Sequence, residues 1–159
     1  SKADILREQL IVVDDSGKVV SGRMRPFSEI ALHLYIYRQR PDVRVVMHAH
    51  PPTATGLSVA GVPVETTMMA EPVVSLGDSI PLIPYARPKS AQWTLGLSPA
   101  VEDADAITLQ NHGVFTVGPD LETAYLRMEL VEHLDQWTLQ TCLNQHLLEG
   151  NYNALEQLH

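Results

Sequence analysis

The sequence predicts an α/β fold in which a sheet of mixed strand directions is covered by helices on both faces. Stretches with helical periodicity alternate with short apolar stretches that are typical of strands. The first two of these strand-like stretches are separated only by a turn, which indicates an antiparallel hairpin. The hairpin favours a sheet that contains antiparallel as well as parallel strands.

The N-terminal part is expected to contain the hairpin and one helix. Residues 9–14 and 18–20 are the predicted strands. Residues 26–40 are a predicted helix, because Pro26 suits a first helical turn and Glu29 places negative charge where the helix dipole favours it. This helix is apolar over most of its circumference, which is typical of a helix that is buried on more than one side.

The rest of the chain predicts a regular succession of further elements. They are strands at residues 43–50, 79–85, 106–110 and 114–117, and helices at residues 51–60 and, more weakly, 89–102. A long helix is expected to begin after Asp120, which is a good N-cap, and to end near Gly150.

Length, charge and composition limit the classes of function. The 159 residues fit a single domain, residues 1–159. The net charge is −8 and the eleven Lys and Arg residues form no long basic block, so we expect no nucleic-acid partner. No apolar stretch is long enough for a membrane helix, so we expect no membrane partner. The single cysteine, Cys142, excludes an intrachain disulfide and fits a cytoplasmic protein.

The most informative residues are histidines at the ends of two predicted strands. His48 and His50 end an apolar stretch, and side chains at this spacing on a strand point to the same face. His112 follows another strand-like stretch and precedes Gly113, where the backbone can approach closely. Three converging imidazoles form the ligand set of a catalytic zinc site with one open position. The sequence therefore predicts a metal-dependent enzyme.

Each candidate residue also has a structural interpretation. A His-x-His pair occurs on strands without a metal, because a buried histidine with satisfied nitrogens needs none. Glu29 lies at the start of a buried helix that leads into the histidine-bearing strand, where it could be catalytic or could serve only the helix dipole. His33 could orient Glu29 or simply pack in the helix. The other histidines, expected at the surface, are His133, His146 and His159.

Four segments together resemble the class II aldolase/adducin family, in particular its L-fuculose-phosphate aldolases. They are residues 25–29 (RPFSE), 40–43 (RPDV), 46–51 (VMHAHP) and 109–114 (LQNHGV). The resemblance covers nearly the whole chain, and it is carried by the order and spacing of the segments together. It implies a three-layer α/β/α fold with a central mixed, largely antiparallel sheet, assembled as a homotetramer. A family segment that should precede Ser1 is absent from this sequence.

The resemblance also implies roles for individual residues. His48, His50 and His112 match the zinc ligands, Glu29 matches the catalytic acid/base carboxylate, and Ser28 matches a serine that contacts substrate phosphate. Three histidines would also suit Mn²⁺, Fe²⁺ or Co²⁺. The implied enzyme is a lyase of carbohydrate metabolism. It would cleave a carbon–carbon bond in a small hydroxy-carbonyl, sugar-phosphate-like substrate through a zinc-stabilised enediolate.

Other activities on the same fold remain as alternatives. Phe27 replaces a family serine, and residues 66–68 (TTM) stand where the fuculose-phosphate enzymes carry a tyrosine. These departures favour a metal-dependent decarboxylase of a hydroxy or keto acid as the runner-up, with Arg87 or Lys89 holding the carboxylate. An epimerase is a further alternative, although the epimerases carry Asp at the position of Glu29. A non-catalytic, adducin-like interaction module is the least favoured, because adducin heads lack the full set of metal ligands.

Overall fold

The computed structural model of this chain describes residues 5–87 and 90–156, without the side chains of residues 91 and 149–156. The chain divides into two compact units, residues 1–41 and 42–159. The organisation of residues 1–159 as a single domain stays a prediction. No helix in the described residues is both long enough and apolar enough to cross a membrane.

The first unit contains the expected hairpin and helix. Its elements are the 3-10 helix η2 (Arg7–Gln9), strands β1 (Val12–Val13) and β2 (Val19–Ser21), and helix α1 (Ile30–Gln39). β1 and β2 pair antiparallel, so the predicted hairpin is confirmed, with a shorter first strand and a second strand shifted by one residue. The Asp14 carboxylate closes the turn by accepting hydrogen bonds from the backbone N–H groups of Ser16 (2.9 Å) and Lys18 (3.0 Å).

Helix α1 begins later than its sequence pattern predicts. A turn precedes it, and Glu29 is the N-cap residue instead of lying inside the first helical turn. The prediction that Pro26 opens the helix is therefore wrong. The Glu29 carbonyl accepts the first helical hydrogen bonds, from the N–H groups of Leu32 (2.9 Å) and His33 (3.3 Å).

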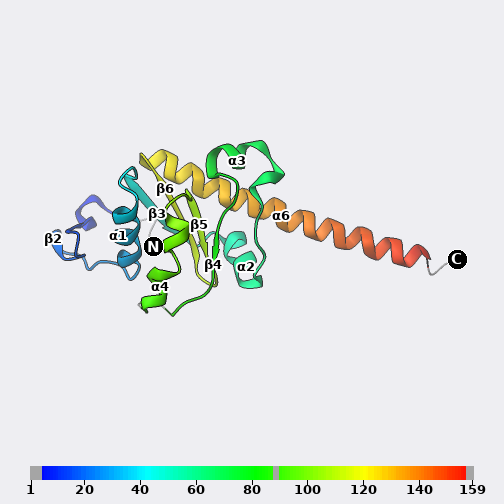
Figure 1. The fold of residues 1–159 in the computed structure, drawn as a ribbon, viewed down its shortest axis with the longest axis horizontal. Coiled ribbons are helices and arrows are strands. Elements are labelled where there is room, and N and C mark those ends of the chain that lie inside the picture. The colour runs from blue at the N-terminus through cyan, green and yellow to red at the C-terminus, as the bar shows by residue number, and fades with distance from the viewer. Residues whose placement is uncertain (1–4, 88–89, 157–159) are drawn as a thin grey trace. The chain divides into compact units, whose positions relative to one another are not determined.

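The second unit is built on a four-stranded sheet with the strand order β3-β6-β5-β4 (Figure 1). Its strands are β3 (Val45–Ala49), β4 (Leu82–Ile83), β5 (Ala106–Leu109) and β6 (Gly113–Gly118). β6 runs antiparallel to β3 and to β5, whereas β4 and β5 are parallel. The predicted α/β fold with a mixed, largely antiparallel sheet is confirmed. Every residue of β6 is buried, as expected for a central strand rich in Val, Phe and Thr.

Six helical segments within the described residues accompany this sheet. They are α2 (Pro52–Ala60), η3 (Thr66–Met68), α3 (Ala70–Leu76), α4 (Ala91–Leu95), α5 (Ser98–Val101) and α6 (Leu121–Glu156). α2 and α6 pack against the sheet and against each other. Their shared core contains Ala54 of α2, Val114 of β6, and Val131 and Leu134 of α6. The first half of α6 therefore contributes to the core, whereas residues 139–148 are all exposed.

Two features of these helices differ from the prediction. Helix α3 has no counterpart among the predicted elements. Pro72 lies within it, but a proline in the first helical turn loses no helical hydrogen bond. The long helix α6 begins as expected, since the Asp120 carboxylate accepts a hydrogen bond from Thr123 N–H (2.7 Å). It continues through Gly150 to Glu156, so the predicted end at Gly150 is wrong. A glycine costs a helix interior only about 1 kcal/mol and does not by itself end it.

Candidate metal centre

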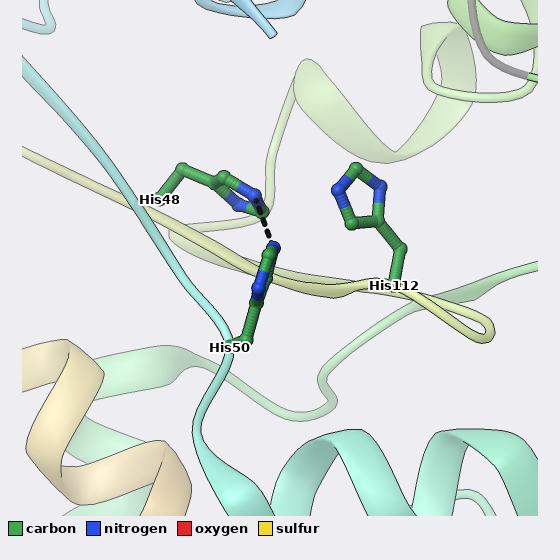
Figure 2. A group of neighbouring side chains, drawn as sticks. All are labelled: His48, His50 and His112. Carbon is green, nitrogen blue, oxygen red and sulfur yellow. Dashed lines mark hydrogen bonds between the residues drawn. The ribbon is translucent and has the colours of Figure 1, made fainter. Parts of the chain in front are cut away.

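The strand pairing of the second unit brings the candidate histidines to one end of the sheet. His48 lies on β3, and His50 follows immediately after the last residue of that strand. His112 lies in the turn that joins β5 to β6. Because Ala49 is the register partner of Val114, this turn comes to lie beside the end of β3. His50 was expected on the strand and lies just beyond it, yet its ring remains on the same side as that of His48 (Figure 2).

The three imidazole rings face a common space, as Figure 2 shows. The His48 and His50 Nε2 atoms are 3.1 Å apart, and one nitrogen from each of the three rings lies within 4.8 Å of the others. Two nitrogens that bind the same tetrahedral zinc ion are roughly 3.3 Å apart. Within the described part of the chain, no other group of three His, Cys, Asp or Glu side chains has this arrangement. The cluster could therefore hold a metal ion after small shifts of the side chains.

The ring of His48 is oriented by the neighbouring strand β6. Its Nδ1 lies 2.9 Å from the Val114 carbonyl oxygen, which can only accept a hydrogen bond. Nδ1 therefore carries the proton, and the lone pair of Nε2 faces the other two histidines. The same ring stacks on the fully buried Phe115, with ring centroids 4.3 Å apart. Hydrogen bonding of the second ring nitrogen to a carbonyl is typical of metal-ligating histidines.

The glycine after His112 is required by the close approach of the chain here. A Cβ atom at Gly113 would overlap the Ala49 carbonyl oxygen and would lie 2.5 Å from Cδ2 of His50. The preceding Asn111 has a φ of 61°, a left-handed conformation that asparagine tolerates better than most residues. The predicted close backbone approach at Gly113 is confirmed, and it lets the turn of His112 pack against the histidines of β3.

The third histidine has an aromatic neighbour that no sequence pattern singled out. Trp93 of α4 is 6% exposed, and its ring lies nearly parallel to that of His112, with an interplanar angle of 16° and ring centroids 6.1 Å apart. The only sequence signal was an apolar aromatic residue in a weakly predicted helix. Trp93 is thus a buried aromatic neighbour of His112.

The other candidate residues lie elsewhere in the chain. In the first unit, the Ser28 hydroxyl donates a hydrogen bond to Glu29 Oε1 (2.5 Å), and the rings of Phe27 and His33 are in edge-to-face contact. Arg87, a candidate carboxylate ligand in the second unit, is exposed, and Lys89 lies outside the described residues. The catalytic role of Glu29 and the substrate contact of Ser28 stay predictions.

Comparison with known proteins places this chain in a family. Residues 1–139 match the family described as Class II Aldolase and Adducin N-terminal domain. The chain is 33% identical over 135 residues to the L-fuculose phosphate aldolase of Haemophilus influenzae, which covers 84% of this chain and 61% of the relative.

Two solved structures share the fold. An L-fuculose 1-phosphate aldolase aligns with a TM-score of 0.78 at 27% identity, over 91% of this chain and 66% of that one. YgbL of Escherichia coli, described as a candidate aldolase/epimerase/decarboxylase, aligns with a TM-score of 0.70 at 29% identity, over 82% of this chain and 64% of that one. The chain therefore spans about two thirds of the length of these proteins, and it belongs to the class II aldolase and adducin N-terminal domain family.

Proposed function

We propose that this chain is the metal-binding part of a lyase that cleaves a carbon–carbon bond in a small hydroxy-carbonyl substrate. The observation that carries the proposal is the convergence of His48, His50 and His112 around one space, which depends on Gly113. The aldolase names of the relatives support the reaction class. Zn²⁺ is the proposed ion, and three neutral imidazoles also suit Mn²⁺, Fe²⁺ or Co²⁺.

We assign a separate role in this reaction to each of these residues. The three histidines would hold the ion, and a bound divalent ion would supply a Lewis acid that polarises a carbonyl oxygen. Glu29 moves the proton that must be exchanged when the carbon–carbon bond breaks. Ser28, whose hydroxyl donates to Glu29 Oε1, fixes that carboxylate and contacts the substrate. Trp93 and Phe115 keep the histidine rings in place through their ring contacts.

Replacement of the carboxylate tests the catalytic part of the proposal. Glu29→Gln keeps the size of the side chain and removes its ability to accept a proton. We expect kcat to fall about 10²- to 10⁴-fold, the usual contribution of a positioned acid/base group. Metal content, measured by elemental analysis, should be unchanged. A Glu29→Gln protein with full turnover on its substrate would refute the role of this residue.

A sugar phosphate is the proposed substrate class, since the L-fuculose phosphate aldolases act on one by name. The runner-up is decarboxylation of a hydroxy or keto acid, and it is supported by the description of YgbL and by Phe27 in place of a phosphate-binding serine. Epimerisation is the third activity. A screen of sugar phosphates against hydroxy and keto acids, with detection of aldehyde product, of carbon dioxide or of an epimer of the substrate, separates the three.

The assembly and location of the protein follow from the same proposal. We propose a cytoplasmic homotetramer that acts on a small molecule in carbohydrate metabolism. Light scattering on the purified protein tests the tetramer. A protein without affinity for added Zn²⁺ would instead support the adducin-like, non-catalytic alternative.

A further inference from the structure

Helix α2 begins directly after the histidine-bearing strand, and its N-terminus is capped from elsewhere in the fold. Its N-cap residue, Pro51, makes no side-chain capping bond, and neither Pro51 nor Pro52 carries a backbone N–H. The first N–H groups that need an acceptor are those of Thr53 and Ala54. Both donate to the carboxylate of Glu132, which lies on α6, with distances of 3.0 Å and 3.1 Å to Oε2.

The Glu132 carboxylate is itself held in place. Gln136, one turn further along α6, donates a hydrogen bond from Nε2 to Glu132 Oε1 (2.9 Å). Burial opposes the charge of Glu132, but hydrogen bonds from Gln136, Thr53 and Ala54 outweigh it and lower the pKa of this carboxyl. An ionised carboxylate at a helix N-terminus is the arrangement that the helix dipole favours.

His50 is the histidine whose position depends most on this cap. His48 is oriented by the Val114 carbonyl and by Phe115, and His112 stacks with Trp93. His50 is exposed and lies between the end of β3 and the start of α2. Its backbone is therefore fixed by the sheet on one side and by the α2 N-terminus on the other.

We propose that Glu132 is a positioning residue of the metal centre. By holding the start of α2 against α6, it sets the direction in which His50 projects towards His48 and His112. This inference rests on the proposed function, because it assumes that the three histidines bind a metal. Glu132 does not touch the ion and acts through the backbone of residues 51–54.

Cobalt titration of the full chain tests this role. Co²⁺ is the probe, and its visible absorption reports the geometry of the bound ion as well as the dissociation constant. We expect Glu132→Ala to weaken Co²⁺ binding about 10- to 100-fold, as loss of an outer partner of a metal ligand does elsewhere, and to change the spectrum. Glu132→Gln retains one acceptor oxygen and the packing of the side chain, so it should fold and show a smaller change in the same direction.

Asp120→Ala is the matched control. Asp120 also caps a helix with its carboxylate, but it lies beyond Gly118, at the end of β6 opposite to Gly113. We expect this variant to lose thermal stability while its Co²⁺ affinity and spectrum stay those of the wild type. Wild-type affinity and spectrum in both Glu132 variants, or an equal loss in Asp120→Ala, would overturn the positioning role. A wild-type chain that binds no Co²⁺ would overturn the proposed metal site itself.

Discussion

The second unit contains a cluster of three ionisable side chains around a shared space and, elsewhere, a single ionisable side chain that is buried alone. At one end of the sheet, His48, His50 and His112 turn nitrogens towards a shared space. On α6, Asp135 is 4% exposed and lines a small cavity with Ser58, Thr108 and apolar side chains. Burial first, and the charge of Glu132 second, raise the pKa of Asp135 from 3.8 to about 7.

The contrast shows that a shifted pKa does not by itself identify a binding site. Several donor atoms that converge can bind a ligand, whereas a single carboxyl in a small cavity mainly costs stability. Two further features hold the histidine cluster together. They are the close backbone approach at Gly113 and the hydrogen bond from His48 to the Val114 carbonyl. Among the described contacts, no comparable group of positioning interactions surrounds Asp135. We therefore assign chemistry to the histidines and a cost in stability to Asp135.

The largest effect is expected from Gly113→Ala. The added Cβ would overlap the Ala49 carbonyl oxygen and crowd His50, so the turn that carries His112 must move away from β3. We expect a loss of about 3 kcal/mol in the free energy of unfolding. The same displacement should remove measurable Zn²⁺ binding, as followed by isothermal titration calorimetry.

Gly56→Ala is the control for this glycine. Gly56 lies within α2, and a Cβ there would meet nothing within 4 Å. This variant should bind Zn²⁺ normally and should be slightly more stable, by up to about 1 kcal/mol, because alanine is the better helix former. Normal Zn²⁺ binding by Gly113→Ala would show that the close approach is not needed for the site.

Asp135→Asn tests whether the buried carboxyl group of Asp135 costs stability. The pKa of Asp135 is raised in the folded state, so the contribution of this residue to stability is most favourable below about pH 4 and declines as the pH rises towards 7. Above pH 7 the buried charge remains as a constant cost. The variant should therefore be more stable than the wild type at pH 8, by roughly 1–3 kcal/mol, and this gain should vanish near pH 4. Urea denaturation at both pH values measures it.

Metal binding shows whether Asp135 only costs stability or also belongs to the metal site. We expect Asp135→Asn to bind Zn²⁺ with the affinity of the wild type, since Asp135 is not part of the histidine cluster. A large loss of affinity in a stable variant would mean that this carboxyl belongs to the site after all.

The smallest effect is expected from Trp93→Leu. The stack between Trp93 and His112 orients a ligand that the β5–β6 turn already holds, so Zn²⁺ affinity should fall by no more than about tenfold. Trp93→Phe keeps an aromatic ring and should lie between Trp93→Leu and the wild type. Equal affinities in all three proteins would assign Trp93 to the core alone.

Sequence patterns predicted those parts of the molecule that depend on local physics. The strand ends that carry His48 and His112 and the Asp120 cap are encoded within a few residues of each position. The turn signal at Gly113 is local too, but the requirement for glycine there comes from Ala49 and His50, which lie far away in the sequence.

The remaining parts depend on contacts between distant segments. Glu132 caps α2 across 79 positions of sequence, and Trp93 reaches His112 from a separate helix, so no local pattern contains either contact. Helix α3 is a further case, because Arg127 of α6 donates a hydrogen bond to the Ser75 carbonyl (3.0 Å) at its C-terminal end. Local propensity could not reveal a helix whose end is fixed by a distant side chain.

Metal analysis of the wild type and of His112→Ala, both purified from cells and then equilibrated with Zn²⁺, tests the metal centre most directly. The wild type should retain about one ion per chain, and His112→Ala should retain almost none, because two imidazoles leave the tetrahedral set incomplete. His133→Ala removes an exposed histidine outside the cluster and should retain the ion as the wild type does. A wild type without zinc, or a His112→Ala protein that keeps its full complement, would contradict the assignment.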